Sequence, residues 1–331
     1  MRNIQKNYFL YDTDVPVVAT PPPFTRDNSF DCCKALLIFL VILGHFFQGC
    51  LKSVETPNHI IDWGGYFIYS FHMPAFMFIS GWFCYGKDYS FMPYLRNSLL
   101  YLCIPFVAWD VIINTIDYCT GNFNGLNSLL TSLWYVKSIV LLRILAYPFI
   151  KKPSLLYGFV FFLIGLLLGQ YYLLALLIPS FMLGLLFNKY HILKNNNAII
   201  ICSIIYIVEL VWVHPSEAVS DLALISHLEC KYWINYLNRL ILGLSGTAIF
   251  IASIRQLFKS VNNSNILGIG RTTLGIYIIQ TLIVERLFSP YVSSYNNILL
   301  YFCLTLASVV ICYYIVLIIK SFSWGRYIVG R

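Results

Sequence analysis

The stretch DNSFDCCKALLIFLVILGHFFQG, residues 27–49, decides the fold class of this protein. Between Lys34 and His45 lie ten residues without a single polar side chain, and the apolar block as a whole covers residues 30–50. A block of about 20 apolar residues is long enough to cross the hydrocarbon core of a bilayer as a helix. The segment therefore predicts a transmembrane helix that carries a charged residue and a histidine.

Apolar blocks of this kind recur along most of the 331 residues. Hydrophobic residues make up 59% of the chain and charged residues only 11%, which excludes a water-soluble domain of this size. Long unbroken blocks also argue against a barrel of short alternating strands. We predict an all-α, polytopic transmembrane helical bundle of about ten spans, near residues 30–50, 64–84, 98–116, 133–150, 154–169, 171–187, 198–213, 236–257, 266–288 and 297–319. The blocks 154–169 and 171–187 meet at Gly169 and Gln170, so either a tight hairpin or one merged, broken helix is expected there.

The basic residues are distributed unevenly between the segments that connect these blocks. With a cytoplasmic N-terminus, fourteen Lys and Arg residues lie inside and two outside, which is the expected bias for cytoplasmic loops. An even number of spans with both termini in the cytoplasm satisfies this bias, as expected for a multi-pass protein of the inner (plasma) membrane. The predicted organisation is a flexible cytoplasmic tail (1–29), a transmembrane domain (30–320) and a short basic cytoplasmic tail (321–331).

Polar residues inside the first span form one stripe. Lys34 and His45 are eleven positions apart, which brings them within 20° of the same helix face, and Asp31 joins them three residues before Lys34. The rise from Lys34 to His45 is about 16 Å, so a basic group near the inner mouth lies below an imidazole deep in the membrane. Intramembrane charges are costly and are retained where they are paired, hydrated or functional.

The second span, GYFIYSFHMPAFMFISGWF (65–83), carries another histidine, His72, two residues before Pro74. Counted from the outer ends of the two spans, the depths of His45 and His72 differ by about 5 Å. Both imidazoles are therefore expected to face one cavity. The alternative is that His72 only forms a hydrogen bond to a neighbouring helix.

Four segments together resemble the integral-membrane acyltransferases of acyltransferase family 3, in the fucose acetylase-like and polysaccharide O-acetyltransferase branch. They are the basic residue, ten residues and histidine of the first span, then FHMPAFMFISGWF (71–83), SLWYV (132–136) and LGIGRTTLGIYIIQ (267–280). The chain departs from the family pattern in two places. Only Arg96 precedes Pro105, where many relatives carry a pair of basic residues, and Gln280 stands where many relatives have His.

The resemblance implies a membrane O-acyltransferase that moves an acyl group, most readily acetyl, from cytoplasmic acyl-CoA to a hydroxyl of a cell-surface or secreted glycan. His45 is then the general base, because an imidazole can accept a proton near neutral pH. Its expected partners in catalysis are His72 and Asp31; Lys34, Arg96 and Arg271 are expected to bind the CoA cosubstrate, and Trp134, Lys137, Asp110 and Gln280 the acceptor. Acetyl-CoA, a glycan or lipid-linked saccharide and membrane lipid are the expected partners, with no permanently bound cofactor, metal or nucleic acid.

Several alternatives stay open at this stage. A transporter or flippase would use the same charges as a proton relay, although the blocks show no repeated halves; a structural subunit would leave the Lys34–His45 stripe unexplained. Asp110 and Lys137 are equally consistent with an ion pair that locks two helices. Lys34 has a second possible role in pairing with Asp31. Residues near the outer face, Glu209, Glu285 and Arg286, are expected at the interface, and the loop 214–235 is expected to be solvated.

Overall fold

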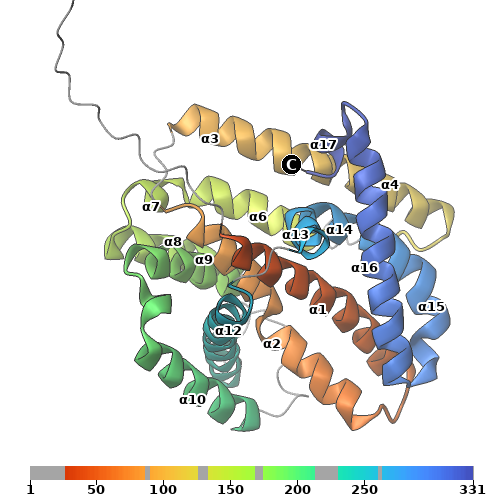
Figure 1. The fold of residues 1–331 in the computed structure, drawn as a ribbon, viewed down its shortest axis with the longest axis horizontal. Helices are drawn as coiled ribbons and strands as arrows, with labels where there is room; N and C mark the ends of the chain where they lie inside the picture. The colour runs from red at the N-terminus through yellow and green to blue at the C-terminus, as the bar shows by residue number, and fades with distance from the viewer. Residues whose placement is uncertain are drawn as a thin grey trace, which may run out of the picture.

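The computed structural model describes residues 27–85, 90–125, 133–167, 174–212, 230–259 and 263–330, and these ranges contain helices and connecting turns but no strand (Figure 1). The all-α prediction is thus confirmed. The predicted tail up to residue 26, the junction at Gly169 and Gln170, most of the loop 214–235 and Arg331 lie outside the described residues.

The α-helices are α1 (Asn28–Ser53), α2 (His59–Trp82), α3 (Phe91–Ser98), α4 (Ile104–Cys119), α6 (Trp134–Leu145), α7 (Tyr147–Lys151), α8 (Leu155–Leu167), α9 (Leu174–Lys189), α10 (Asn196–Trp212), α12 (Cys230–Leu257), α13 (Ser264–Arg271), α14 (Thr273–Gln280), α15 (Ser289–Val292), α16 (Ile298–Ser321) and α17 (Gly325–Ile328). The π-helices are η1 (Leu99–Cys103) and η3 (Thr281–Phe288), and the short 3₁₀ turns are η2 (Ile192–Lys194) and η4 (Ser293–Tyr295).

Each of the ten apolar blocks coincides with a helix or a run of consecutive helices. Among the described residues, four helices are long and apolar enough to cross a membrane by themselves: Asn28–Ser53, Phe91–Cys119, Ile234–Leu257 and Ile298–Ser321. A bent pair would add a fifth, and three further apolar helices are shorter, with 10–17 residues. The helical membrane fold therefore stands, while the count of ten spans stays a prediction.

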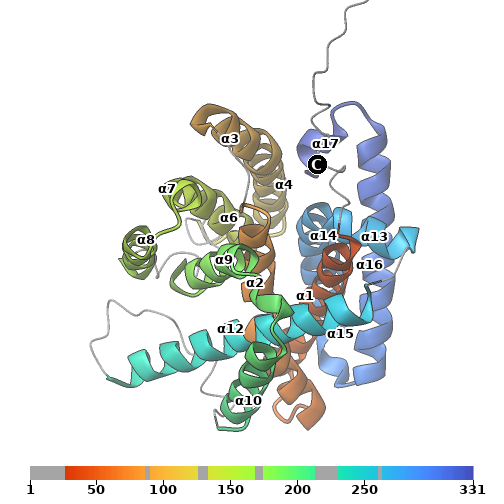
Figure 2. The same cartoon turned by 60° about the vertical axis from the view of Figure 1, so that its left-hand side comes forward.

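Helix α1 lies at the centre of the bundle, between α2 and α16 (Figures 1 and 2). In the most apolar 18-residue stretch of α1, 67% of the residues are buried inside the protein. The corresponding share is 28% for α16 and 22% for the helix Phe91–Cys119. The helix begins at an N-cap, Asp27, whose side chain accepts a hydrogen bond from the Ser29 amide. Because α1 is enclosed by other helices, the polar stripe that it carries faces protein.

Helices α2 and α9 cross at a pair of glycines. A Cβ atom at Gly81 would lie 1.9 Å from the Phe181 carbonyl oxygen, and one at Gly184 would lie 2.0 Å from the Phe78 carbonyl oxygen. Small residues at such a crossing let two backbones meet, and close packing is a main source of helix association in a membrane. The crossing fixes the C-terminal half of α2, the helix that carries His72.

The block 266–288 is not one straight helix, which corrects the sequence-based expectation of a simple span. Helices α13 and α14 are separated at Thr272 and bent by 67°. Gly270 allows this arrangement, because a Cβ atom there would lie 2.0 Å from the carbonyl oxygen of Asp31 in α1. The first half of the broken helix thereby packs against the beginning of α1, and the second half continues into the π-helix η3.

The C-terminal residues, expected as a short tail, pack against the bundle. Trp109 of α4 donates its indole N–H to the Ile328 carbonyl oxygen over 2.9 Å, and Val329 is buried. Gly275 of α14 lies directly beside Val329. The described part of this segment is therefore continuous with the helical domain.

Candidate active site

The centre of the candidate site is a contact between His45 and an acidic residue 240 positions away. His45 of α1 is half-buried, and its Nε2 lies 3.5 Å from Oε1 of Glu285 in η3. Gln280, whose side chain is fully buried, donates from Nε2 to the same carboxylate oxygen over 3.4 Å. A carboxylate beside an imidazole orients the ring and stabilises the cation that forms when the ring takes up a proton.

The π-helix explains how Gln280 and Glu285 meet. Residues five apart in an α-helix are 140° away from each other around the axis and do not share a face. In a π-helix the repeat is i to i+5, and such short π-helical segments occur frequently at functional sites. The local geometry of η3 therefore brings the amide of Gln280 and the carboxylate of Glu285 to the side that faces His45.

His72 lies close to this pair but has a different local partner. Its Nδ1 lies 2.6 Å from the Ile68 carbonyl oxygen of its own helix, and its ring packs edge-on against Tyr69, with 5.1 Å between centroids. The Tyr69 hydroxyl in turn donates to Oε1 of Gln48 in α1 over 3.2 Å, one turn beyond His45. His72 is buried, and its hydrogen-bond partner is a carbonyl of its own helix. The alternative stated in the sequence analysis had placed this partner on a neighbouring helix. Its part in the chemistry stays a prediction.

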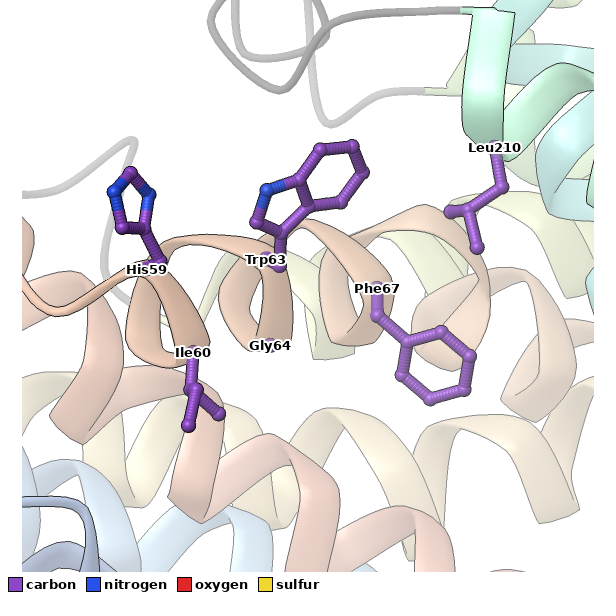
Figure 3. A pocket seen from close by; sticks show the side chains of 6 residues that line it. All are labelled: His59, Ile60, Trp63, Gly64, Phe67 and Leu210. Atoms are coloured by element: carbon purple, nitrogen blue, oxygen red, sulfur yellow. The ribbon is translucent and has the colours of Figure 1, made fainter.

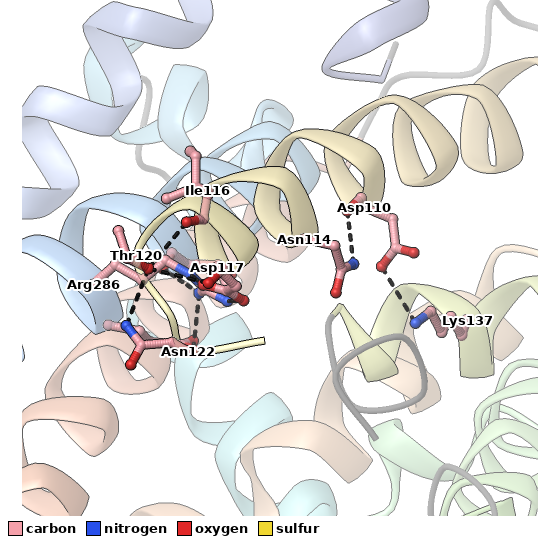
Figure 4. Close-up of polar contacts among 10 residues, drawn as sticks. Asp110, Asn114, Ile116, Asp117, Thr120, Asn122, Lys137 and Arg286 are labelled. Atoms are coloured by element: carbon pink, nitrogen blue, oxygen red, sulfur yellow. Dashed lines mark hydrogen bonds and ion pairs between the residues drawn. The ribbon is translucent and has the colours of Figure 1, made fainter. Parts of the chain in front are cut away.

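A second ion pair holds η3 from the other side. Arg286 binds Asp117 of α4 with two hydrogen bonds, Nε to Oδ1 at 2.7 Å and Nη2 to Oδ2 at 2.6 Å (Figure 4). Arg286 also donates from Nη1 to the Thr281 carbonyl oxygen over 3.1 Å and lies 3.9 Å from Oε2 of Glu285. This bidentate geometry fixes the planar guanidinium, and with it the turn that carries Glu285.

Asp110 and Lys137, two predicted acceptor-binding residues, form an ion pair between α4 and α6. The distance from Nζ of Lys137 to Oδ1 of Asp110 is 3.3 Å (Figure 4), and the side chains are only 8% and 15% exposed. Lys137 also lies over the ring of Phe106, 5.3 Å from its centroid. The pairing matches the alternative in which these residues lock two helices, while an acceptor-binding role stays a prediction.

Three of the predicted residues form a charged cluster at the beginning of α1, which we call the inner cluster: Asp31, Lys34 and Arg271. Asp31, with a side chain 3% exposed, lies 2.7 Å from Nζ of Lys34 and 3.3 Å from Nε of Arg271. The Arg271 side chain is 47% exposed, so part of its guanidinium faces outward. The cluster carries one net positive charge. Fourteen residues of helix, about 21 Å, separate Asp31 from His45, so the structure does not place Asp31 beside the predicted base.

The structure also places Arg96 and Trp134 away from both groups. Arg96 is exposed on α3, a helix whose main neighbours are α6 and η1. Trp134 begins α6 and packs, partly buried, against the hydrophobic core and the ring of Tyr135. In the described part of the chain, no hydrogen bond, ion pair or ring contact joins either residue to His45, Glu285 or the inner cluster.

An open apolar pocket of about 410 Å³ lies at the N-terminal end of α2. His59, Ile60, Trp63, Gly64 and Phe67 of α2 line it together with Leu210 of α10 (Figure 3). The rings of Trp63 and Phe67 are exposed there. None of the predicted site residues is in its lining, so it is not the candidate active site.

Sequence reasoning missed Glu285, Arg286 and Asp117 as parts of the site. Glu285 and Arg286 were expected at the interface because they lie near the end of an apolar block, and Asp117 falls just beyond another block. The available signal was that charged residues of opposite sign occupied two apolar segments without local partners. Which of them pair across the bundle depends on helix packing, which no local pattern in the sequence reports.

The fold and this site define an integral membrane protein with an internal acid–base pair and a separate cationic cluster. A family model described as "Acyltransferase domain" matches residues 27–317, and the chain belongs to this family. This family membership confirms the resemblance seen in the four motifs.

Two curated relatives share part of the chain. Nodulation protein NolL of Sinorhizobium fredii is 39% identical over 94 residues, which cover 27% of this chain and 25% of that protein. Nodulation protein NolL of Mesorhizobium japonicum is 37% identical over 95 residues, covering 28% and 25%. The matches thus span about a quarter of the length of these relatives. No solved structure matches the chain.

Proposed function

We propose that this protein transfers an acetyl group from cytoplasmic acetyl-CoA to a hydroxyl of a glycan or lipid-linked saccharide, in the inner membrane and with both termini in the cytoplasm. One observation carries the proposal: His45, paired with Glu285, lies on the same central helix as Lys34 and Asp31 of the inner cluster, about 16 Å from Lys34. A base deep in the bundle and a cationic group at its mouth are what a CoA-dependent acyl transfer requires.

The chemistry proceeds through the proton of the acceptor hydroxyl. As the hydroxyl oxygen attacks the thioester carbonyl carbon, His45 removes its proton, which is general-base catalysis. Glu285 stabilises the resulting imidazolium. When the tetrahedral intermediate collapses, the C–S bond breaks and the imidazolium returns the proton to the departing CoA sulfur. With Nε2 of His45 directed at Glu285, Nδ1 is the nitrogen that accepts the proton.

The donor is expected to bind with its phosphates at the inner cluster. Lys34 and Arg271 both contact Asp31, which holds the two cations at one place while leaving Arg271 partly exposed. A guanidinium binds phosphate oxygens in a bidentate manner. The flexible pantetheine arm of CoA would then extend along α1 toward His45, and the acceptor would approach from the outer side.

The decisive experiment compares purified wild type with His45→Ala in lipid nanodiscs. Acetyl transfer from labelled acetyl-CoA should fall on the order of 10²–10⁴-fold, the usual contribution of a general base. His59→Ala, an exposed histidine at the start of α2, is the matched control and should retain wild-type activity. Retention of more than about a tenth of the transfer in His45→Ala would contradict the assignment of the base.

A second readout tests the acceptor class and the transporter alternative together. Glycans from cells with and without the protein should differ by the mass of acetyl groups in mass spectrometry. A protein that moves a labelled lipid-linked sugar across liposomes, but neither binds nor hydrolyses acetyl-CoA, would be a transporter and not this enzyme.

A further inference from the structure

Arg239 in α12 is a charged residue that the site described above does not use. It is half-buried, and no hydrogen bond or ion pair joins its guanidinium to another described residue. Five other cations of the bundle have a carboxylate partner among the described residues: Lys34, Lys137, Arg255, Arg271 and Arg286. An uncompensated charge inside a membrane segment is costly, so Arg239 calls for a functional explanation.

Arg239 lies as far along α12 from the beginning of α1 as His45 lies along α1. At the inner end of α12, Arg255 binds Asp27 over 2.8 Å and Ser29 over 3.4 Å, which fixes this end beside the beginning of α1. Arg239 lies 16 residues before Arg255, and His45 lies 16 residues after Ser29, so each is about 24 Å from this anchor. In Figure 2, α12 crosses α1 and α2, and it contacts both.

Contacts between α12 and α2 place Arg239 near His72. Gly243, one turn after Arg239, meets Pro74 and the Ser70 carbonyl oxygen, and its Cβ would lie 3.1 Å from the Pro74 ring. Thr247, one further turn along, donates to the Phe71 carbonyl oxygen over 3.5 Å. The charges of Arg239 and His45 are the two that act on His72 from neighbouring helices. Arg239 therefore borders the same interior region as the two histidines.

The described carboxylates do not neutralise Arg239. Glu285 is engaged with His45 and Gln280. Glu209 of α10 lies near the same part of α12 as Arg239, because Tyr206, one turn earlier in α10, packs against Gly246 of α12. One carboxylate oxygen of Glu209 is nevertheless buried without a hydrogen-bond partner, and no ion pair joins Glu209 to Arg239 among the described residues. A ligand is the remaining source of negative charge in the described part of the site.

We infer that Arg239 binds an anionic group of the acceptor, a phosphate or carboxylate carried by the saccharide close to the hydroxyl that is acylated. The inference rests on the proposed function. The donor's phosphates are assigned to the inner cluster at the beginning of α1, and Arg239 lies about 24 Å along α12 from the contact of Arg255 with that beginning, so the anion at Arg239 belongs to the second substrate. A guanidinium beside the part of α2 that carries His72 both neutralises this anion and positions the sugar within the region of the two histidines.

The test uses two synthetic acceptors of the same sugar, one a neutral farnesyl glycoside and the other a farnesyl phosphoryl glycoside. For the phosphorylated acceptor, Arg239→Gln should lower kcat/KM about 10–100-fold, the range of a lost charge-assisted hydrogen-bonded pair, with the loss in KM. The neutral acceptor should change less than about twofold, and Arg239→Lys should recover part of the preference. Arg255→Gln, the same substitution 16 residues along the same helix, should leave the ratio between the two acceptors unchanged.

Different outcomes separate the two hypotheses. Wild type that transfers acetyl to neither acceptor would refute the proposed function. Wild type that transfers acetyl, but loses activity toward both acceptors equally in Arg239→Gln, would overturn the anion site. So would rescue of Arg239→Gln by Glu209→Gln, which would mean that the two residues neutralise each other. A loss that occurs in nanodiscs containing phosphatidylglycerol but not in pure phosphatidylcholine would assign Arg239 to lipid headgroups and also overturn the inference.

Discussion

Replacing Glu285 by Gln tests whether the carboxylate beside His45 takes part in catalysis. The substitution keeps the size of the side chain and its capacity to accept a hydrogen bond from Gln280, but it removes the negative charge 3.5 Å from Nε2 of His45. The charge acts only when the imidazole is protonated, that is, in the transition state and the intermediate. We therefore expect kcat to fall while the KM for acetyl-CoA stays nearly constant.

The magnitude follows from the distance and the exposure. Two unit charges 3.5 Å apart attract each other by about 1 kcal/mol in water and about 5 kcal/mol at an effective dielectric constant of 20. The Glu285 side chain is 36% exposed, which favours the lower part of this range, about 2 kcal/mol. That free energy corresponds to a decrease in kcat of about 30-fold.

The assay is steady-state transfer of labelled acetyl groups by purified protein in nanodiscs, with the melting temperature as a measure of folding. Glu209→Gln, on α10 and without contact to His45, is the matched control for loss of a carboxylate in the bundle. If Glu285→Gln retained full kcat with an unchanged melting temperature, the His45–Glu285 pair would have no catalytic role. A loss confined to the KM for acetyl-CoA would move Glu285 to donor binding.

Substitutions at three positions and two reporter fusions test the donor cluster, the packing of α13 on α1, the Arg286 anchor and the membrane topology. Lys34→Ala should raise the KM for acetyl-CoA more than it lowers kcat, and Lys34→Arg should restore much of the affinity; a fall in kcat alone at saturating donor would place Lys34 in the chemistry or in a structural pair. Gly270→Ala should lower the free energy of unfolding by about 1–3 kcal/mol, measured by thermal denaturation, because its Cβ would lie 2.0 Å from the Asp31 carbonyl oxygen. Gly65→Ala is the control, since a Cβ atom there would have its nearest contact at 3.4 Å. Equal stability of the two variants would contradict the close approach of α13 to α1. Asp117→Asn should lower kcat several-fold, because Arg286 loses its ion-pair partner and no longer holds the turn that carries Glu285. Asp110→Asn is the comparison on the same helix. An unchanged kcat in Asp117→Asn would mean that the Asp117–Arg286 pair has no part in catalysis. Reporter fusions after residues 29 and 331 should both indicate the cytoplasm, and a C-terminal reporter accessible from outside would require an odd number of spans.

The sequence by itself determined the helices and the class of protein. Each apolar block became helical because a long run of apolar residues in a membrane must satisfy its backbone hydrogen bonds internally, a local requirement. The stripe from Lys34 to His45 follows from the helical period, and the pairing of Lys34 with Asp31 links residues one turn apart. The four motifs, read together, were enough to indicate the acyltransferase family.

Only the tertiary structure decided which charges meet. The partners of His45 and Asp31, namely Glu285 and Arg271, are each 240 residues away, and Arg286 reaches Asp117 across 169 residues. The break at Thr272 and the π-helix that follows it set the direction of these side chains, and both depend on contacts such as Gly270 against the backbone of α1. A local pattern reports the face on which a residue lies but not the helix that this face meets, because that choice is made by close packing between distant segments.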